Sequence, residues 1–440
     1  MIPSAPVWCN AQSAPHPRVP NSTVRADVAV IGGGFTGLSA AYHLLTRRPG
    51  IKVAVLEAQQ LGAGASGRNT GMLGPGVGQS LTSLVRRHGP ARAKALYAAT
   101  LRAVEDVRRL VARERIDCEL MMTGHLMAAL NPAGRMRLKA QSALMAALDL
   151  PFATMDDEAL DRAIRLERSH GGDGVAGLRL PIAGTLNPMR LLGGLADRVI
   201  ARGGSIFESS RVITVNGRRP VRLAIDGGGE VVADEVVVAT AGYTPALGLL
   251  RGRILPVHLQ VVVTEPLRRS TRELLGWTGR EGVIDSRRIF SYFRLTTDDR
   301  VVFGGGQPRY VWGGRTGESS SAPAALDRLA RELRTVFPPQ AALTVAGGWT
   351  GVIGYVLDAL PAIERARGNP SLLHAVGWCG HGIALSVAAG EWITQILLDG
   401  AVKEDLPWYR DNPPLLPFET LRWAGFQAGV RALAFLDSIN

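Results

Sequence analysis

The first 60 residues alternate apolar runs with a helical pattern, as parallel β-α-β units do. Residues 26–31 form a short, mostly apolar run, a helical pattern follows to about residue 46, and a second apolar run covers 53–56. Continuous apolar runs of this length are typical of strands that helices cover on both faces. We therefore expect a β-α-β unit over 26–57, with the right-handed crossover that such units take.

The rest of the chain continues with longer helical patterns separated by short apolar or alternating runs. The spacing of apolar positions predicts further helices at residues 81–115, with an interruption at Gly89-Pro90, and at 135–148, 188–202, 324–337, 383–398 and 418–436. Shorter runs predict strands at residues 121–130, 205–208, 211–215, 221–225, 230–232, 235–239, 257–264, 283–285, 289–295, 300–305, 342–349 and 372–376. The run 235–239 suits a parallel sheet, whereas the runs between 257 and 305 alternate as antiparallel strands do.

A glycine pattern stands between the first predicted strand and the first predicted helix. Gly32, Gly34 and Gly37 have the spacing Gly-x-Gly-x-x-Gly, in which the glycines allow a tight turn, a close approach to a pyrophosphate and close helix packing. The N-terminus of the following helix offers free N–H groups to phosphates. Glu57 ends the second strand about 20 residues later, where an acid holds ribose hydroxyls. The pattern predicts a dinucleotide site, and the alternative is a glycine-rich turn in an ordinary α/β protein.

The predicted strands give the domain organisation. Those that suit a parallel sheet lie near the start, in the middle and near the end of the chain, with antiparallel material between them. The expected fold class is therefore α/β with an inserted α+β domain. We expect an extended N-terminal arm at residues 1–25 and a C-terminal tail helix at 401–440. Between them, we expect a Rossmann-like nucleotide-binding domain made of the discontinuous segments 26–80, 185–250 and 342–400. The segments 81–184 and 251–341 are expected to form an antiparallel-sheet substrate domain.

Composition and charge narrow the classes of function. The 440 residues are 46% hydrophobic and 20% charged, which is typical of a globular chain long enough for two or three domains. The net charge of +12 is spread along the chain without basic runs, which favours a solvated surface over a nucleic-acid site.

Three cysteines and no leader or spanning segment favour a reducing cytoplasm. No histidine has metal-ligand spacing, so we expect no metal. The tail helix is amphipathic and could contact a membrane or pack on the body.

Four motifs together resemble the D-amino-acid oxidase/glycine oxidase (DAO) superfamily of FAD enzymes, and within it the γ-glutamylputrescine oxidase-like branch, over about residues 20–400. They are the stretch 27–37 with Glu57, the Gly-Ala-Ser-Gly-Arg-Asn of 64–69, the Ala-Thr-Ala-Gly of 239–242, and Trp349 with the Asp-Ala-Leu-Pro of 358–361 and the Gly-His-Gly of 380–382. The resemblance implies FAD contacts at Gly32, Gly34, Phe35, Thr36, Gly37, Glu57, Ala58, Gly64, Ala65, Ser66, Arg68, Asn69, Thr70, Val212, Thr240, Ala241, Gly242, Trp349, Gly380, His381, Gly382 and Ile383.

The same resemblance suggests catalytic residues. A helix N-terminus at 380–382 would stabilise negative charge on a reduced flavin, and His381 is either part of this site or only a cap. Arg294 lies on the strand that the family places over the flavin, and its guanidinium suits a substrate carboxylate; a structural ion pair is the alternative. Strand alternation puts Tyr292 on the same face as Arg294. His258 and Gln260 could face this pocket or belong to the core.

Departures from the family pattern limit the functional assignment. The stretch 300–306 has no Lys of the kind that activates oxygen in the sarcosine oxidase-like branch, and Trp349 stands near the position of that branch's flavin-linked Cys. We therefore expect non-covalent FAD and an oxidoreductase that oxidises a C–N bond of a small, possibly carboxylate-bearing amine or amino acid. Hydride transfer to flavin N5, imine hydrolysis and reoxidation by O2 to H2O2 are the expected steps. A dehydrogenase with another electron acceptor, or a catalytically silent flavin-binding protein, are the alternatives.

Overall fold

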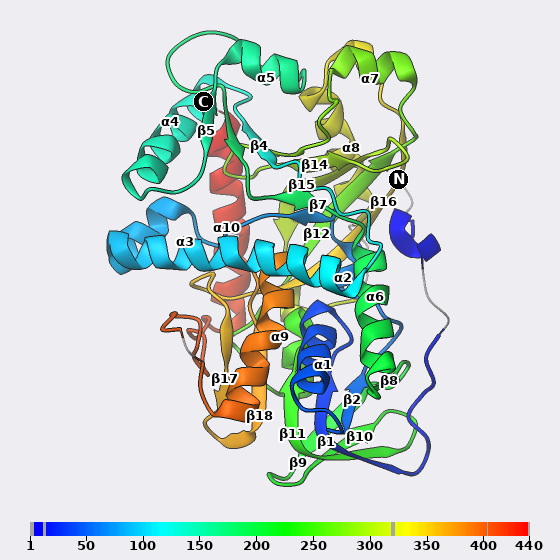
Figure 1. Ribbon diagram of the computed structural model, residues 1–440. Helices are drawn as coiled ribbons and strands as arrows, with labels where there is room; N and C mark the ends of the chain where they lie inside the picture. The colour runs from blue at the N-terminus through cyan, green and yellow to red at the C-terminus, as the bar shows by residue number, and fades with distance from the viewer. Residues whose placement is uncertain (1–3, 12–14, 318–321, 403, 439–440) are drawn as a thin grey trace.

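The computed structural model describes residues 4–11, 15–317, 322–402 and 404–438. Parts of the predicted N-terminal arm and tail (1–3, 12–14, 403 and 439–440) lie outside the described residues. Two eight-stranded sheets, one in the lower and one in the upper half of Figure 1, are each covered by helices. The predicted fold class is confirmed, because a parallel sheet with helical crossovers is combined with a largely antiparallel one.

The first sheet contains the predicted β-α-β unit. Its central strands run parallel in the order β18-β11-β1-β2-β8. β17 pairs antiparallel with β18, β10 pairs antiparallel with β11, and β9 pairs antiparallel with β10. The bounds are β1 (Thr23–Ile31), β2 (Val53–Leu56), β8 (Ser205–Phe207), β9 (Val212–Asn216), β10 (Val221–Ile225), β11 (Glu230–Val238), β17 (Ala362–Ala366) and β18 (Asn369–Val376). The two short runs predicted at 230–232 and 235–239 are thus one strand, β11.

Helices α1, α6 and α9 cover one face of this sheet (Figure 1). The hydroxyl of Ser39 in α1 donates to the carbonyl of Val387 in α9 at 2.6 Å, and a Cβ at Gly390 would lie 2.2 Å from the Ser39 Oγ. Glycine at 390 therefore permits the close contact of the two helices. Asn187 caps α6 through its side chain, which accepts the N–H of Arg190. The bounds are α1 (Phe35–Arg47), α6 (Pro188–Ala201) and α9 (Gly382–Asp399).

The second sheet has the order β16-β12-β15-β14-β13-β4-β6-β5, with all pairs antiparallel except β13 and β4. Helix α8 packs on one face, where Phe293 and Phe303 meet Leu326 and Leu329. Its strands are β4 (His125–Ala128), β5 (Ala153–Met155), β6 (Gly177–Leu180), β12 (Leu255–Thr264), β13 (Gly282–Asp285), β14 (Tyr292–Leu295), β15 (Val301–Arg309) and β16 (Val345–Tyr355).

The remaining elements connect or border the two sheets. Helix α3 crosses the front of the molecule at the level where the sheets meet (Figure 1), and its kink at Gly89 (φ 77°) agrees with the predicted interruption. The bounds are α2 (Ala65–Arg68), α3 (Leu81–Glu114), α4 (Pro132–Ala147), α5 (Asp157–Ala163), α7 (Arg269–Leu275), α8 (Ala322–Val336), α10 (Glu419–Ser438), η1 (Val7–Ala11), η2 (Ala241–Leu247), η3 (Trp312–Gly314), η4 (Pro339–Ala341), and the pair β3 (Met72–Leu73) and β7 (Gly184–Thr185).

Three expectations differ from the structure. β16, predicted at 342–349 within the nucleotide-binding segments, pairs with β12 in the second sheet and continues to Tyr355. The N-terminal arm contains the short helix η1, and the glycine-rich stretch 62–80, for which no helix or strand is predicted, contains α2 and β3. The last two differences have one cause: short elements stabilised by distant partners carry little periodicity of their own.

The tail helix α10 packs on the body. Glu419 accepts hydrogen bonds from the Tyr310 hydroxyl at 2.9 and 3.0 Å, and Asp437 at the other end accepts one from the backbone N–H of Ile289 at 2.8 Å. Both acidic side chains of this helix thus anchor it to the second sheet and its loops. Within the described residues, no helix is both long and apolar enough to cross a membrane.

Candidate functional site

The turn between β1 and α1 requires glycine at two of its positions. Gly32 has φ +108°, and a Cβ there would lie 2.7 Å from the carbonyl oxygen of Ala239 in the neighbouring turn. A Cβ at Gly37 would lie 2.0 Å from the carbonyl oxygen of Gly32. Gly34 caps α1 without a side chain, and Phe35 and Thr36 form the buried first turn. The backbone can therefore come close to a ligand at the positive end of α1.

Glu57 lies directly after β2, beside this turn. Its Oε2 accepts the N–H of Gly33 at 2.9 Å, and its Oε1 accepts the N–H of Gln59 at 3.0 Å. Burial raises the pKa of Glu57, although these backbone N–H groups act in the opposite direction. Ala58 follows it in the chain, and Val212 is buried at the start of β9 in one cluster with Leu56. A carboxylate is thus held at the end of β2.

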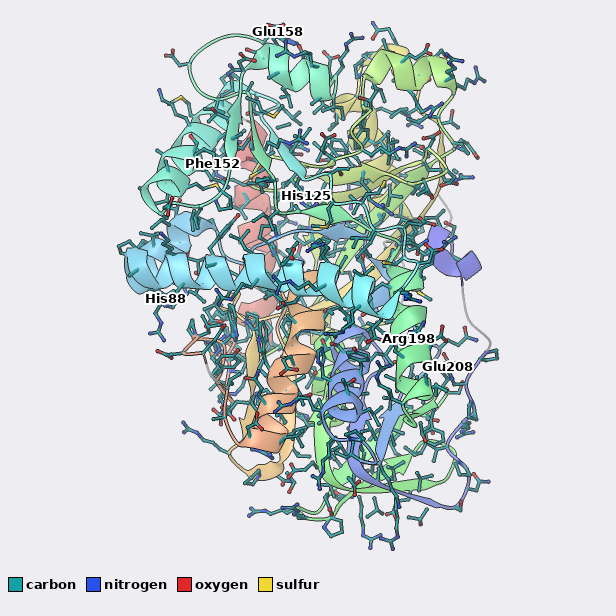
Figure 2. All side chains as sticks on the ribbon, in the orientation of Figure 1. His88, His125, Phe152, Glu158, Arg198 and Glu208 are labelled. Atoms are coloured by element: carbon teal, nitrogen blue, oxygen red, sulfur yellow. The ribbon has the colours of Figure 1, made fainter. Side chains whose placement is uncertain are left out.

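Glu208, directly after β8 (Figure 2), is a second acid in this region. Its Oε1 accepts the N–H of Leu61 at 2.5 Å and its Oε2 the N–H of His16 at 2.8 Å. It therefore joins the N-terminal arm to the loop after β2. No motif marks this residue, because an acid at a strand end is common and its partners are backbone groups.

The second glycine-rich stretch lies against the first. The hydroxyl of Ser66 accepts the N–H of Phe35 at 3.0 Å, and a Cβ at Gly34 would lie 2.9 Å from that oxygen. Gly64 caps the short helix that begins at Ala65. Residues 32–37 and 64–66, predicted to bind one ligand, thus lie together.

Three successive carbonyl groups of this loop each accept a hydrogen bond from a different buried side chain. The indole Nε1 of Trp349 donates to the carbonyl of Arg68 at 2.9 Å. The indole Nε1 of Trp8 donates to the carbonyl of Asn69 at 3.0 Å, and the Nε of Arg294 donates to the carbonyl of Thr70 at 2.8 Å. The loop is therefore held between the N-terminal segment and the second sheet. Trp8 was not a predicted site residue.

Arg294 is completely buried without an acidic partner. Its Nη1 and Nη2 have no hydrogen-bond partner among the described residues, and burial lowers the pKa of Arg294 to about 10. Its guanidinium carbon lies 5.0 Å from the centroid of the Trp8 ring. The two NH2 groups of a guanidinium that stays charged at neutral pH are thus available to an anion, and an ion pair of Arg294 with an acid is absent from the described residues.

Tyr292 and Phe290 lie near Arg294 on the same side of the chain. Their rings are 5.9 Å apart, and a Cβ at Gly304 would lie 2.4 Å from the Tyr292 ring. Burial raises the pKa of Tyr292 to about 12, so its hydroxyl stays protonated. The expected alternation along β14 holds, because Phe293 packs on the other face with Phe303.

The other two polar candidates lie on that opposite face. Gln260 Nε2 donates to the carbonyl of Gln307 at 2.9 Å, and a Cβ at Gly306 would be 3.5 Å both from that nitrogen and from Leu329 of α8. The ring Nε2 of His258 bonds to the carbonyl of Arg315 at 2.9 Å. Gln260 therefore faces α8 rather than the side that carries Arg294, and His258 shares its face by alternation along β12.

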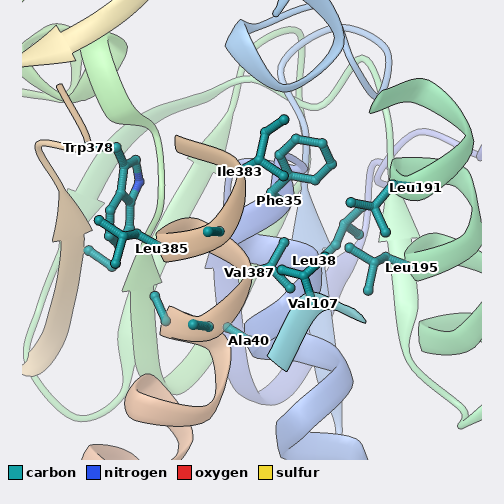
Figure 3. Close-up of a cluster of buried hydrophobic side chains, with 14 of the residues drawn as sticks. Phe35, Leu38, Ala40, Val107, Leu191, Leu195, Trp378, Ile383, Leu385 and Val387 are labelled. Carbon is teal, nitrogen blue, oxygen red and sulfur yellow. The ribbon is translucent and has the colours of Figure 1, made fainter. Parts of the chain in front are cut away.

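The N-terminus of α9 lies beside that of α1. Figure 3 shows Ile383 of α9 close to Phe35 of α1, in one buried cluster. Gly380 has φ +90°, and His381 precedes Gly382 as the N-cap without donating or accepting a side-chain cap bond. Burial lowers the pKa of His381, and its Nδ1 has no partner among the described residues. The free N–H groups of two helices thus point to the same side of the sheet.

The turn after β11 closes the site from the second sheet. A Cβ at Gly242 would lie 2.9 Å from the carbonyl oxygen of Ile353 in β16, and Ala241 has φ +46°. The Thr240 hydroxyl bonds to that of Thr244 at 2.9 Å. The turn therefore joins the two sheets next to Gly32.

No three His, Cys, Asp or Glu side chains in the described ranges are placed to hold a metal ion.

Comparison with known proteins agrees with this geometry. The family model described as FAD dependent oxidoreductase (DAO) matches residues 27–396. The chain is 31% identical over 403 residues to gamma-glutamylputrescine oxidoreductase of Escherichia coli K12, with 88% of each chain covered, and 24% identical to a glycine oxidase of Bacillus licheniformis, with 87% of this chain and 95% of the relative covered.

Solved structures share the fold. A glycine oxidase from Geobacillus kaustophilus superposes with a TM-score of 0.70 at 20% identity, covering 89% of this chain and 98% of its own. The L-proline dehydrogenase from P. horikoshii gives 0.69 at 20% identity, covering 90% and 97%. From the family match over residues 27–396, the chain belongs to the DAO family of FAD-dependent oxidoreductases.

Proposed function

We propose that this protein oxidises the C–N bond of a small amine or amino acid that carries a carboxylate. The single observation that supports this most is the buried guanidinium of Arg294, whose Nη1 and Nη2 lack partners among the described residues. A buried charge without a partner is costly, and a bound carboxylate would relieve that cost through two charge-assisted hydrogen bonds. The names of the relatives, a gamma-glutamylputrescine oxidoreductase and a glycine oxidase, agree with such a substrate.

The residues present fit FAD. The turn at 32–37 would hold the pyrophosphate, Glu57 the ribose hydroxyls, and the loop 64–70 the part of the cofactor that leads to its ring; the turns at 240–242 and 380–382 would complete the site. We propose that the first sheet with its helices is the FAD-binding domain, and that the second sheet, with β16 added to it, is the substrate domain. FAD when bound would accept a hydride at N5 from the carbon bearing the amine and pass its electrons to O2, giving H2O2.

The chain's own residues would bind, orient and exclude water. Arg294 would hold the carboxylate, while Tyr292 and the buried Trp349 would keep the pocket dry. With FAD bound, the N-terminus of α9 would stabilise negative charge on the flavin ring. No obligatory general base is needed when the substrate amine arrives neutral, and the imine product would hydrolyse in water.

A specific observation favours a second candidate, a dehydrogenase that uses another electron acceptor. Strand β15 contains no Lys, and the side chain beside Arg294 on it is Val302, so the cation that promotes oxygen reduction in the sarcosine oxidase-like branch has no counterpart there. Turnover with O2 compared with turnover with an artificial dye separates the two. Brisk dye reduction without peroxide would rule out the oxidase.

The test of the whole proposal is anaerobic mixing of the purified yellow protein with a panel of amines. The panel contains glycine, sarcosine, L-proline and γ-glutamylputrescine, each with its carboxylate-free analogue. We expect bleaching of the flavin band at about 450 nm by a carboxylate-bearing member and much slower bleaching by its analogue. No bleaching by any amine would favour a catalytically silent flavin protein, and no yellow colour would contradict the FAD assignment.

A further inference from the structure

We propose that the N-terminal segment 4–11 is a wall of the substrate site, in which Trp8 is a positioning residue that orients the Arg294 guanidinium toward a carboxylate. This inference rests on the proposed function, because it requires that Arg294 receive a carboxylate. Trp8 lies in the short helix η1 (Val7–Ala11), well before β1, the first strand of the fold.

Two contacts hold the guanidinium of Arg294: the Trp8 ring, and the Thr70 carbonyl at its Nε. The Trp8 ring covers its face, with the guanidinium carbon 5.0 Å from the ring centroid, and its Nε donates to the Thr70 carbonyl at 2.8 Å. The edge formed by Nη1 and Nη2 has no partner among the described residues. This is the edge that binds a carboxylate with two parallel hydrogen bonds.

Trp8 is fixed by a hydrogen bond of its own ring, and the start of its segment is fixed to β16. Its Nε1 donates to the Asn69 carbonyl at 3.0 Å, and the ring is 3% exposed. Ser4 pairs with Gly348 of β16: its N–H donates to the Gly348 carbonyl at 2.7 Å, and its hydroxyl accepts the Gly348 N–H at 3.1 Å. In Figure 1 the segment lies beside β16 at the edge of the second sheet. The indole cannot turn away without losing its hydrogen bond to the Asn69 carbonyl.

An uncharged aromatic ring such as that of Trp8 can hold the Arg294 guanidinium without cancelling its positive charge. Glu119 and Asp298 are the acids whose charge influences Arg294, and neither makes a hydrogen bond or ion pair with it. An indole face attracts the cation without neutralising it, and such an attraction is stronger in a desolvated site. A carboxylate partner at the same place would compete with the substrate. Trp8 can therefore hold the guanidinium while leaving its charge for a ligand.

The experiment uses two matched variants of the flavin-loaded enzyme. Trp8→Phe retains a ring face and Trp8→Leu retains only bulk, while both lose the N–H. The probe is acetate, whose binding is followed by the change in flavin absorbance, together with KM and kcat for the carboxylate-bearing substrate found in the amine panel. We expect Trp8→Leu to weaken acetate binding and raise KM about tenfold with kcat within about twofold, and Trp8→Phe to recover most of the loss.

The outcomes separate this inference from the proposed function. Wild-type acetate affinity in Trp8→Leu, or equal losses in both variants, would overturn the role of the ring. If Arg294→Ala leaves acetate affinity unchanged, the carboxylate role of Arg294 fails, and this inference fails with it. If Trp8→Leu does not retain flavin, Ser4→Ala replaces it; loosening the segment at Gly348 should weaken acetate binding about two- to threefold without altering kcat, and no change would again overturn the inference.

Discussion

The indole Nε1 of Trp349 donates a 2.9 Å hydrogen bond to the main-chain carbonyl of Arg68. This bond joins strand β16 of the second sheet to the loop that follows β2 of the first. The Nη1 of Arg68 returns the contact by donating to the carbonyl of Thr350 at 3.0 Å. The loop that we propose holds FAD is thereby tied to β16, the strand that pairs with β12, so the proposed site lies where the two sheets meet.

We expect Trp349→Phe to lower the free energy of unfolding by about 1–3 kcal/mol, because the Arg68 carbonyl would be buried without a donor. FAD content after purification should fall as well, since residues 68–70 lose one of their three donors. Urea unfolding and the ratio of flavin to protein absorbance measure these effects. Trp423→Phe on the exposed side of α10 is the matched control. Equal stability of the two variants would contradict the role given to this bond.

Gly37→Ala should abolish FAD binding. A methyl group there would lie 2.0 Å from the Gly32 carbonyl oxygen, so α1 would have to move away from the turn. The helix N-terminus would then no longer reach the phosphates. Absorbance at about 450 nm and circular dichroism distinguish lost cofactor from lost fold. Gly368→Ala is the control, because a Cβ there would meet nothing within 4 Å.

Arg294→Ala should raise KM for a carboxylate-bearing substrate about 100-fold, which is the value of two charge-assisted hydrogen bonds. The carboxylate-free analogue should be oxidised at a nearly unchanged rate, because it never used the guanidinium. Steady-state kinetics with both amines give the answer, with Arg269→Ala in the exposed ion pair to Glu273 as control. An unchanged KM for the carboxylate substrate would show that the assignment is wrong.

The parts of the site that the sequence predicts are those where a residue type is needed locally. Glycine at 32 and 37 follows from a close backbone approach, and an acid at 57 follows from its place at a strand end. Trp8 has no such signal, because its role depends on two distant partners, Arg294 and Asn69.

The pairing of strands, and the sheet face on which a side chain is buried, also depend on residues far apart in the sequence. The apolar pattern of β16 marks a strand but does not show that β12 is its neighbour, so the sequence alone does not assign this strand to the second sheet. Alternation shows that His258 and Gln260 share a face, but only the packing of α8 shows which face that is. Which face of the second sheet is packed against α8, and which face carries Arg294, therefore follows from the three-dimensional structure and not from the sequence pattern.

His125 should make stability depend on pH between about 4 and 6.5. It is buried beneath β3, its ring Nε2 bonds to the Gly184 carbonyl at 2.8 Å, and burial lowers the pKa of His125 to about 4. Below its ordinary pKa the unfolded chain binds a proton that the folded chain does not, so the stability falls as the pH falls through this window. The loss reaches about 3 kcal/mol near pH 4.

Urea unfolding at several pH values tests this, with His125→Gln, which can still donate to the Gly184 carbonyl. The variant should lose this part of the pH dependence, whereas His170→Gln, in a side chain that is 57% exposed, should retain it. Parallel curves for wild type and His125→Gln would mean that the histidine does not titrate differently in the folded state.

FAD should be released intact when the protein is precipitated with acid. Cys379 is the thiol nearest in sequence to the 380–382 turn, and burial raises the pKa of Cys379 to about 12, so the thiolate needed to form a bond to flavin is absent at neutral pH. The sulfur accepts the N–H of Val356 at 3.5 Å inside a small apolar cluster. We expect all yellow colour in the supernatant and the same flavin content for Cys379→Ser. A yellow pellet from wild type that turns white in Cys379→Ser would instead show covalent attachment through this sulfur, since only a bonded cofactor remains with the denatured chain.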